Sequence, residues 1–589
     1  MTAEDPLTED ASTAKPSEVE LAKAASRGLR GHLAETLASG ASAFENDDVQ
    51  VLKFHGIYQQ DDRDARRIRR LTGADKEHWF MVRCKIPGGE LTADQYLALD
   101  RIAGRHGNAS LRITTRQGLQ LHGVLKDELK PAVAAINRAL VSTLAACGDV
   151  ERNVMAPAAP YAGGAFAEAR RLAAEIAAEL CPRTRAYHEI WLDGERVETG
   201  DPPPAGAEEP FYGDGYLPRK LKTAVALPED DSVDVRAQDI GLIAIPEGDR
   251  IRAVVLLAGG GLGMTHKKAD TFARIGTPVG TVERRHAVAA VRAVAAILRD
   301  HGNRSDRRHA RLKYLIEDWG IGRFREELLS RIDFPLDPPV ELGPLRHRDH
   351  LGLHDQGDGR WFYGVFVAEG RIADTPRRRT RTALRRIVQT LRPRVLLTPD
   401  QNLLLADLHA DGGEAVEQVL AAYGVPLPSE LSRVRRHAVA CPALPTCGLA
   451  LADAERAMED VMASFEAELS RHGLDTEEIA VRMTGCPNGC ARPYTADVGI
   501  VGRSPGVYDL YVGGGLARGR LADLWDEQVP IDRIAESLSP LLAEWAGGRR
   551  GGEGLGDYFE RVHRGGRRRT LLTGDKSVAV GREVAATVA

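Results

Sequence analysis

The 589-residue sequence predicts an α+β protein built from mixed α/β halves that are internally duplicated and related by a pseudo-two-fold axis. Three observations lead to this fold class. Two different sequence patterns each occur twice, the copies alternate along the chain, and each copy combines short apolar runs with helical stretches. A chain of this length is expected to form several domains. The order of the copies, written A, B, A′ and B′, organises the analysis of every other motif.

Pattern A consists of an apolar run, a glycine turn, a helical stretch and a second apolar run that carries Thr and Gln. Its two copies occupy the segments MVRCKIPGGELT at 81–92 with LRITTRQGLQLHG at 111–123, and YGVFVAEGRIA at 363–373 with VLLTPDQNLLLAD at 395–407. The polar residues that match between the copies are Thr114 with Thr398, and Gln117 with Gln401. Pattern A therefore predicts two similar half-domains.

Pattern B consists of two apolar runs, the second of which ends in glycines. Its copies are AQDIGLIAI at 237–245 with VVLLAGGGLG at 254–263, and ADVGIVG at 496–502 with YDLYVGGGLA at 508–517. These glycines lack the Gly-x-Gly-x-x-Gly spacing of a dinucleotide site, so we interpret them as turns at strand ends. No P-loop pattern is present. The sequence therefore shows no nucleotide site of its own.

The repeats predict the following division of the chain. The predicted segments are an N-terminal extension at 1–49, half-domains A and A′ at 50–145 and 343–425, domain B at 146–342, domain B′ at 426–575 and a C-terminal tail at 576–589.

Four of the seven cysteines lie within fifty residues of each other, in ACPALPTCGLA and TGCPNGCARP. They are Cys441, Cys447, Cys486 and Cys490. Neighbouring prolines and glycines predict loops in which the four thiolates converge, which suits a 4Fe–4S cluster. Structural zinc sites usually have two to four residues between paired cysteines, whereas the first pair here has five. Zinc binding and buried structural cysteines remain the alternatives.

Lys220 and Lys222 alternate in YLPRKLKTAV, along a predicted strand. Side chains two residues apart on a strand face the same way, so both ammonium groups can line one pocket. We place this string at the position in B that the cysteine loops occupy in B′. One half would then hold a redox centre and the other would hold anion-binding cations, around a shared cofactor.

Clusters of basic residues raise nucleic-acid binding as an alternative function. In TTRQGLQLHG, however, Arg116 is mixed with Thr, Gln and His along an alternating strand, which suits hydrogen bonding to a polycarboxylate ligand. The arginine runs at 377–381 and 567–569 are interpreted as solvated surface that could help to dock an acidic electron carrier.

Composition restricts the class of protein further. The formal net charge of −5 is small for this length and indicates no particular partner. Seven cysteines in a chain of this size fit a reducing cytosol. The N-terminal MTAEDPLTEDASTAKPSEVE is acidic and polar, unlike a signal peptide. No apolar run approaches the length of roughly 20 residues that a membrane helix needs. We therefore expect a soluble, cytoplasmic protein.

Eight strings make the chain resemble the sirohaem-dependent sulfite and nitrite reductases, and within them the haemoproteins of assimilatory sulfite reduction. The strings are FHGIYQQDDRD (54–64), LRITTRQGLQLHG (111–123), CGDVERNVM (147–155), YLPRKLKTAV (216–225), HGNRSDRRHARLKY (301–314), TPDQNLLL (398–405), CPALPTC (441–447) and TGCPNGC (484–490). The resemblance implies a three-domain fold with ferredoxin-like half-domains A and A′ around a central sirohaem. It also implies the six-electron reduction of sulfite to sulfide in sulfur assimilation and cysteine biosynthesis.

The resemblance also implies roles for individual residues. The four cysteines would bind a 4Fe–4S cluster, and Cys490 would bridge it to the sirohaem iron. Arg83, Arg152, Lys220 and Lys222 would bind the sulfite anion, and the lysines would supply protons directly or through ordered water. The expected sirohaem contacts are Arg112, Thr114, Arg116, Gln120, His122, Asn303, Arg304, Arg307 and Gln401.

Some relatives carry a covalent bond between a tyrosine ring carbon and a cysteine sulfur, and Tyr58 and Cys147 match those positions. A buried free thiol beside a tyrosine is the alternative. Glu151 stands where many relatives carry Asn, and we expect its carboxylate to point away from the anion pocket.

Three functions remain in competition. A sirohaem-dependent nitrite reductase would use the same cofactors, but such relatives typically carry Asn at the position of Lys222, which favours sulfite. A non-catalytic zinc-binding or nucleic-acid-binding protein would leave the two lysines and the duplication unexplained. The electron donor is expected to be an NADPH-dependent flavoprotein or a ferredoxin, with no membrane and no specific nucleic acid as partners.

Overall fold

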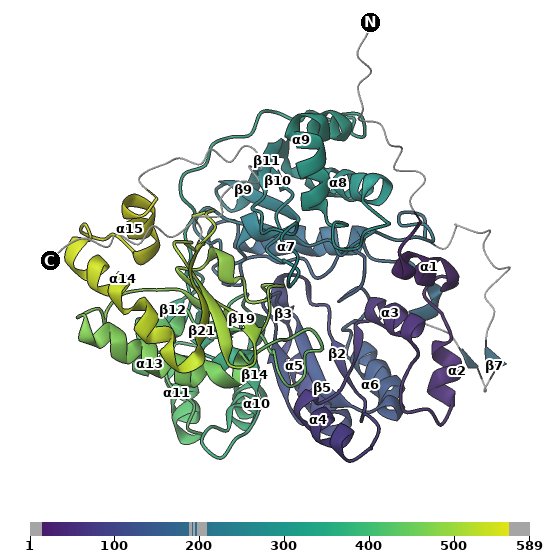
Figure 1. Ribbon diagram of the computed structural model, residues 1–589, viewed down its shortest axis with the longest axis horizontal. Helices are drawn as coiled ribbons and strands as arrows, with labels where there is room; N and C mark the ends of the chain where they lie inside the picture. The colour runs from purple at the N-terminus through teal and green to yellow at the C-terminus, as the bar shows by residue number, and fades with distance from the viewer. Residues whose placement is uncertain (1–14, 188–190, 193–194, 197–208, 517, 565–589) are drawn as a thin grey trace, which may run out of the picture.

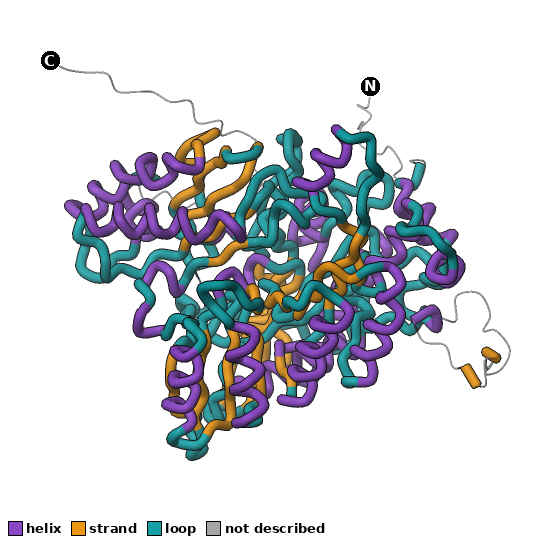
Figure 2. Tube along the Cα trace, turned by 90° about the horizontal axis from the view of Figure 1, so that it is seen from below, coloured by secondary structure: helices purple, strands orange, loops and turns teal. Residues whose placement is uncertain are grey.

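The computed structural model describes residues 15–187, 191–192, 195–196, 209–516 and 518–564 (Figure 1). Within these ranges, four larger mixed or antiparallel sheets form the framework, and helices pack against them. A small hairpin of β6 (Trp191–Leu192) and β7 (Glu195–Arg196) lies apart from the other strands (Figure 2). None of the helices in the described ranges is long and apolar enough to cross a membrane. The predicted α+β class is confirmed.

Half-domains A and A′ each contain a five-stranded sheet with the same strand order. The strands of the A sheet are, in spatial order, β1 (Ile57–Gln60), β2 (Trp79–Arg83), β5 (Leu119–Val124), β4 (Leu111–Ile113) and β14 (Arg371–Ile372). Those of the A′ sheet are β12 (Gly352–Asp355), β13 (Trp361–Val365), β16 (Leu403–Leu408), β15 (Arg394–Leu397) and β3 (Glu90–Leu91). The helices of the two halves are α5 (Ala93–His106) and α6 (Lys126–Arg138) in A, and α10 (Thr380–Leu391) and α11 (Gly412–Ala422) in A′.

The two half-domains exchange their shortest strands. Strand β14 follows A′ strand β13 in sequence but pairs with β4 of A, and β3 follows A strand β2 but pairs with β15 of A′. Side chains from both halves also form one continuous apolar cluster. Neither sheet is complete without the other half, so A and A′ form one structural unit.

Matching turns of the two halves meet at the pseudo-two-fold axis. The Gln117 amide donates to the Leu397 carbonyl at 2.9 Å, and the Gln401 amide donates to the Ile113 carbonyl at 3.4 Å. Gly370 has φ 74°, and a Cβ atom there would lie 2.4 Å from the Ile113 carbonyl oxygen. Only glycine permits this approach. The predicted correspondence of Gln117 with Gln401 is confirmed.

Domains B and B′ also share a topology. In spatial order, the strands of the B sheet are β8 (Thr223–Ala226), β9 (Ile240–Glu247), β10 (Arg250–Ala258) and β11 (Thr277–Glu283). Those of the B′ sheet are β17 (Val439–Ala440), β18 (Val481–Thr484), β19 (Val498–Ser504), β20 (Val507–Val512) and β21 (Asp523–Pro530). Each sheet contains a parallel pair that is followed by two antiparallel pairs, so β8 corresponds to β18 and β9 to β19. The B′ sheet has one further parallel strand, β17, beside β18. The helices are α7 (Phe166–Glu179), α8 (Ala287–His301) and α9 (Leu312–Leu329, kinked at Gly320) in B, and α12 (Arg433–Arg436), α13 (Met458–Arg471), α14 (Ile534–Gly548) and α15 (Leu555–Val562) in B′.

This topology corrects one sequence-based assignment. Lys220 and Lys222 precede β8, whereas Cys486 and Cys490 follow the corresponding strand β18. The segment of B that matches the Cys486 loop is therefore 227–239. The lysines and the cysteines do not occupy equivalent positions, and they face each other because the two domains pack on opposite sides of a shared cavity.

The N-terminal part of the chain forms four helices, α1 (Glu18–Ala25), α2 (Leu33–Ala38), α3 (Asn46–Phe54) and α4 (Arg63–Leu71). Helix α1 packs on domain B, although it belongs to the predicted extension. Its buried Lys23 donates to the Leu217 carbonyl at 2.8 Å and lies 3.8 Å from Asp149, and Glu20 pairs with Arg304 at 2.5 Å. The segment from Ser17 onward is therefore part of the folded core.

A buried charge network joins domain B, half-domain A′ and domain B′. Arg482 of β18 and Arg492 beside the last cysteine both contact Asp234 of B, at 2.5 and 3.0 Å. The same two arginines contact Asp400 in the A′ turn, at 3.5 and 3.1 Å. Removing one partner of such a buried network leaves an uncompensated charge, so the network fixes the relative position of the three units. The predicted domain boundaries themselves remain a prediction.

Candidate functional site

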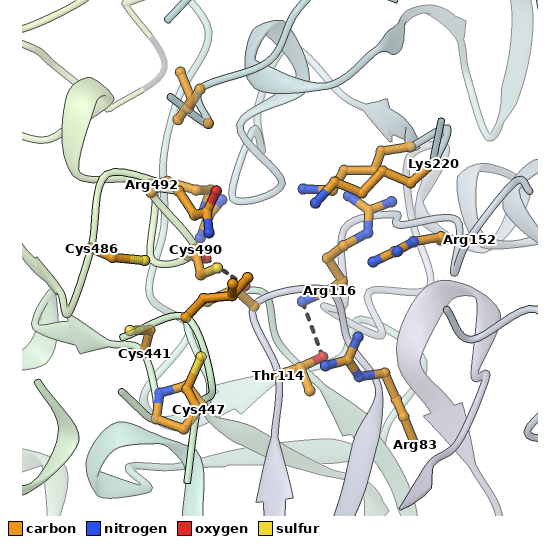
Figure 3. Close-up of a pocket in the computed structure, with 18 of the residues that line it drawn as sticks. Arg83, Thr114, Arg116, Arg152, Lys220, Cys441, Cys447, Cys486, Cys490 and Arg492 are labelled. Atoms are coloured by element: carbon orange, nitrogen blue, oxygen red, sulfur yellow. Dashed lines mark hydrogen bonds between the residues drawn. The ribbon is translucent and has the colours of Figure 1, made fainter. Parts of the chain in front are cut away.

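A cavity of about 510 Å³ lies where the half-domains, B and B′ meet. The turn of A at 114–118, the segment before β8 and both cysteine loops all contribute to its wall. In Figure 3 the four cysteine sulfurs lie on one side of the cavity, and Arg83, Arg116, Arg152 and Lys220 lie on the opposite side. One face of the cavity is therefore suited to a metal cluster and the other to anions.

The cysteines come from two loops that follow adjacent parallel strands. Cys441 directly follows β17, and Cys486 and Cys490 follow β18. Because the carboxyl ends of parallel strands meet at one edge of a sheet, this arrangement brings the loops together. All four cysteines line the cavity, as predicted. The Gly485 amide donates to the Cys441 sulfur at 3.4 Å, the kind of contact that stabilises a thiolate.

The surroundings of these cysteines favour the protonated thiols over the thiolates when no metal is bound. Burial and the neighbouring thiol of Cys490 raise the pKa of Cys441 and Cys447, and raise the pKa of Cys486 to about 12. A metal ion deprotonates its coordinating thiols outright. The set therefore fits a metal-binding role better than a role as reactive free thiols.

A cluster and a zinc ion need different spacings of the four sulfurs. In the described part of the chain, no three His, Cys, Asp or Glu side chains are close enough to hold a single metal ion. A tetrahedral zinc with bonds of about 2.3 Å would need all four sulfurs within about 4 Å of one another. A 4Fe–4S cluster spaces its thiolates more widely, because each binds a different iron. The choice between them rests on the spacing of the cysteines in the sequence and on the family match reported below.

The predicted anion-binding side chains come from three segments. Arg83 ends β2, Arg152 follows a buried turn, and Lys220 and Lys222 lie on the extended segment before β8. All four line the cavity, and Leu221 between the lysines is fully buried on the other side of the backbone. The alternation predicted from the sequence is thus present, and it brings the four cations together.

Burial of these cations in one cavity raises the free energy of their charged forms. Desolvation, reinforced by Arg219 and Arg152, lowers the pKa of Lys220 well below its usual value. Desolvation and Arg311 act in the same way on the pKa of Lys222. A lysine whose pKa is lowered gives up its proton more readily, and an arriving anion restores the charged form. The site is therefore suited both to binding an anion and to transferring protons to it.

Glu151 contacts the backbone of the segment that carries the lysines. Its carboxylate accepts hydrogen bonds from the Thr223 amide at 3.1 Å and the Thr223 hydroxyl at 2.9 Å, and its backbone bridges to Leu221. It is not part of the cavity wall, so the prediction that it points away from the pocket is confirmed. Burial, opposed by Arg116, raises the pKa of Glu151 to about 7. Glu151 thus holds the segment of Arg152 in register with that of Lys222.

Seven of the nine expected sirohaem contacts line the cavity. They are Arg112, Thr114, Arg116, Gln120, His122, Arg307 and Gln401. Arg116 donates to the Gln238 side chain at 2.7 Å, and Arg307 is held by Asp149 at 2.7 Å. Arg112 is already paired with Glu455 at 3.0 Å and with the Ala440 carbonyl at 2.9 Å, so it also ties β4 to the strand before Cys441.

The other two expected contacts, Asn303 and Arg304, lie outside the cavity wall. The Asn303 side chain accepts hydrogen bonds from the amides of Ser305 and Asp306, at 3.0 and 2.7 Å, and thus stabilises its own turn. Arg304 is engaged by Glu20 of α1 and by the Tyr216 carbonyl at 2.7 Å. Neither side chain lines the cavity wall, and direct contact of Asn303 and Arg304 with the cofactor stays a prediction.

Sequence analysis missed several cavity residues that supply charge or polarity. They are Arg219, Arg308, Arg311, Asn153, Gln238 and Arg492. Arg219 precedes Lys220, and Arg492 stands two residues after Cys490. Their closeness in sequence to these motifs could have indicated that they also line the cavity. Arg308 and Arg311 lie in the string HGNRSDRRHARLKY at 301–314, but which of its arginines face the cavity depends on the fold.

Unpartnered polar atoms in the cavity wall fit a large polar cofactor. In the described part of the chain, both ring nitrogens of His122, the Arg116 Nε and the Gln401 Oε1 are buried without a hydrogen-bond partner. Native proteins rarely leave such groups unsatisfied. Desolvation and nearby arginines lower the pKa of His122 well below its usual value, so the ring is neutral. A cofactor with several carboxylates would satisfy these groups and compensate the cations.

Tyr58 and Cys147 lie side by side near Arg83. Cys147 is close enough to Tyr58 to act on it electrostatically, and Arg83 donates to the Cys147 sulfur at 3.0 Å. The Arg83 guanidinium also lies 5.6 Å from the centre of the Tyr58 ring. Desolvation and Cys147 raise the pKa of Tyr58. The structure carries Cys147 as a free thiol, and the predicted covalent link to Tyr58 stays a prediction.

Fold and site together define a redox enzyme that holds an iron–sulfur cluster beside a cationic anion pocket. Residues 173–336 and 432–562 match the family described as "Nitrite and sulphite reductase 4Fe-4S domain", and residues 72–139 and 354–423 match "Nitrite/Sulfite reductase ferredoxin-like half domain". The chain belongs to the nitrite and sulfite reductase family. This membership confirms the predicted family and its cofactors, sirohaem and a 4Fe–4S cluster.

Individual relatives support the same assignment. The chain is 43% identical to "Sulfite reductase [ferredoxin]" of Synechococcus elongatus, over 94% of this chain and 91% of that protein. It is 45% identical to "Sulfite reductase [NADPH] hemoprotein beta-component" of Acidithiobacillus ferrooxidans, over 92% and 96% of the two chains. The solved structure of Mycobacterium tuberculosis NirA superimposes with a TM-score of 0.75 at 23% identity, covering 93% of this chain and 97% of that one, which supports the fold.

The cysteine set leads to a first prediction. Cys447→Ser or Cys486→Ser should remove the cluster, because a hydroxyl is a poor ligand for iron. The measurement is iron and acid-labile sulfide per chain, together with the visible absorption spectrum. Cys181→Ser is the matched control, since Cys181 lies outside the cavity wall. Full cluster content in Cys447→Ser would contradict the assignment.

Glu151 leads to a second prediction. Glu151→Ala should cost about 1–3 kcal/mol of unfolding free energy, because the Thr223 amide and hydroxyl lose their acceptor. It should also raise KM for the anion, as the segment of Lys222 loosens. Glu151→Gln should preserve both properties, since the Gln oxygen can accept from the amide and its nitrogen can donate to the hydroxyl. Denaturant unfolding and steady-state kinetics provide the measurement, and equal behaviour of the Ala and Gln variants would refute this role.

Proposed function

We propose that the protein catalyses the six-electron reduction of sulfite to sulfide in the cavity between domains B and B′, as an assimilatory enzyme of cysteine biosynthesis. The observation that carries this proposal is the placement of Arg83, Arg152, Lys220 and Lys222 opposite four converging cysteines. Relatives named as sulfite reductases, similar over more than nine tenths of the chain, support the choice of substrate.

The four cations have two roles in this reaction. They attract the anion into a buried site and stabilise the negative charge that accumulates as electrons arrive. The two lysines also supply protons as the sulfur–oxygen bonds break, for which their lowered pKa suits them. Sulfite, six electrons and seven protons give hydrosulfide and three waters, so proton supply within the cavity is essential.

The remaining cavity residues would hold the cofactors. Arg116, Arg307, His122 and Gln401 would bind the carboxylates of sirohaem, and the four cysteines would bind the 4Fe–4S cluster, with Cys490 bridging to the haem iron. When bound, these groups supply electrons to the anion one at a time. The protein orients the anion against them and excludes bulk water from the partly reduced sulfur.

Nitrite is the alternative substrate, and Lys222 is the residue that argues against it. Lys222 adds a second ammonium group beside Lys220, and the doubly charged sulfite gains more from it than the singly charged nitrite does. Because the two amines lie in the same desolvated cavity, each added charge is felt strongly there.

This reasoning gives a third prediction, which also tests the proposed function. With dithionite-reduced methyl viologen as donor, the unmodified protein should form sulfide from sulfite. Lys222→Asn should weaken sulfite binding by about 1–3 kcal/mol, the worth of one charge-assisted hydrogen bond. It should also shift the ratio of kcat/KM values toward nitrite. The exposed Lys268→Asn serves as the control. Absence of sulfide would end the proposal. An unchanged ratio of the kcat/KM values for sulfite and nitrite would show that Lys222 does not determine the choice between these anions.

We also retain the covalent link between Tyr58 and Cys147 as a proposal and a fourth prediction. Their proximity fits oxidative coupling of a ring carbon to the sulfur, a step that forms one C–S bond, breaks one C–H and one S–H bond, and passes two electrons and two protons to an oxidant such as dioxygen. The link would stiffen the pocket wall beside Arg83 by removing side-chain freedom. Intact mass and tryptic mapping of the purified holoenzyme provide the test. Joined peptides lighter by two hydrogens would support it, and two separate unmodified peptides would exclude it.

The source of electrons is a separate protein. Relatives are named for ferredoxin or for NADPH as donor, so both classes of donor, a ferredoxin and an NADPH-dependent flavoprotein, remain candidates. We place the reaction in the cytoplasm, supported by the seven cysteines expected to be reduced there.

A further inference from the structure

Helix α4 is the most strongly basic element beside the cysteine loops. Its nine residues, RDARRIRRL, contain five arginines and one aspartate, in a chain whose overall formal charge is −5. The Asp62 side chain caps the helix by accepting hydrogen bonds from the amides of Asp64 and Ala65, at 2.8 and 2.9 Å. This concentration of positive charge plays no part in the cavity, because none of its residues lines it.

The first residue of α4 is attached directly to the loop that carries Cys447. The Arg63 amide donates to the Pro445 carbonyl at 3.1 Å. The Arg63 guanidinium donates to the Cys447 carbonyl at 3.4 Å and also to the Ala450 carbonyl. Asp64 adds an ion pair with Arg456 of domain B′ at 2.6 Å. The helix is thus fixed against the outer side of the cluster-binding loop.

One face of α4 is exposed and combines charge with apolar surface. Arg67 and Arg70 are one turn apart, are exposed, and have no ion-pair partner in the described ranges. Ile68 and Leu71, also one turn apart, are 65% and 82% exposed. The other arginines are engaged, Arg66 with Asp61 and Arg69 with Glu77. Two free cations beside two bare aliphatic side chains are typical of a contact surface, not of a merely solvated helix.

We propose that this face of α4 is the docking surface for the electron donor, and that the donor is a small acidic one-electron carrier of the ferredoxin class. The inference rests on the proposed function and specifies its partner. Arg67 and Arg70 would steer the acidic carrier, and Ile68 and Leu71 would form the dry centre of the contact. Each docking would oxidise one carrier by one electron, so six encounters would serve each sulfite.

Charge, position and size together favour this class of partner. An acidic surface complements the exposed cations, and electrostatic steering speeds association where repeated encounters are needed. The helix adjoins the loop of Cys447, so a carrier bound there lies next to a cluster ligand. A single nine-residue helix offers a small contact area, as in transient redox complexes, which sit at the low end of interface sizes. A large flavoprotein bound permanently would need a broader apolar surface.

The test compares donors on the same holoenzyme. In the double variant Arg67→Glu/Arg70→Glu, KM for a purified acidic plant-type ferredoxin should rise roughly tenfold or more, and the dependence of the rate on salt should weaken. Sulfite reduction driven by reduced methyl viologen should remain unchanged, since this small dye does not require a docking surface. The matched control is Arg252→Glu, which reverses the charge of an exposed arginine on β10 of domain B.

Each outcome has a defined meaning. An unchanged KM for ferredoxin, or an equal rise in the Arg252→Glu control, would overturn the proposal. Loss of the viologen-driven rate would show that α4 acts on the site itself, which would also overturn it. A defect seen only with an NADPH-dependent flavoprotein would assign the surface to that donor instead. Failure of the unmodified protein to reduce sulfite with viologen would count against the proposed function, not against the docking surface.

Discussion

Uncompensated positive charge in a buried cavity is the constraint on which the rest of the structure depends. Arg116, Arg152, Lys220, Lys222 and Arg311 converge there, and the nearby carboxylates of Asp149 and Asp239 are too few to neutralise them. Burial desolvates both lysines and the neighbouring arginines repel them, and the two effects together lower the pKa values of Lys220 and Lys222. The arrangement becomes favourable when the carboxylates of a cofactor and an anionic substrate enter. The fold therefore holds the cations in place for binding before either group arrives.

A site of this kind must be held from several directions, and the duplicated architecture provides this. Exchange of β3 and β14 locks the half-domains together at the axis, and the network of Arg482, Arg492, Asp234 and Asp400 ties B and B′ to the A′ turn. Helix α1 adds a third support, because Lys23 and Glu20 hold the segments of Asp149 and Arg304. The charge network and the contacts of α1 use buried charges that are costly to leave unpaired, so the cations cannot move apart without breaking contacts between domains.

The sequence predicted the features that local strings specify, and it failed where distant segments decide. The cysteine loops and the alternation of Lys220 and Lys222 could be recognised because spacing alone fixes which side chains converge. The orientation of Asn303 and Arg304 could not be predicted, because a turn-capping bond and Glu20, nearly three hundred residues away, direct their side chains away from the cavity wall. Lys220 and Lys222 were wrongly matched to the cysteine loops, because short apolar strings do not show which strand of domain B corresponds to which strand of domain B′. The burial of α1 depends on contacts between segments that no local pattern reveals.

The strand exchange has a consequence for the order in which the molecule is made. The edge of β4 in half-domain A stays unpaired until β14 at Arg371–Ile372 has been synthesised, after the whole of domain B. An open sheet edge is a site for wrong pairing, and contacts of such sequence separation form slowly. Because the cysteine loops come later still, the cavity closes only when nearly the whole chain has left the ribosome. The cofactors can therefore enter only a late, almost complete folding intermediate. Without them, the repulsion between the cations in its cavity would make this intermediate the least stable species during assembly.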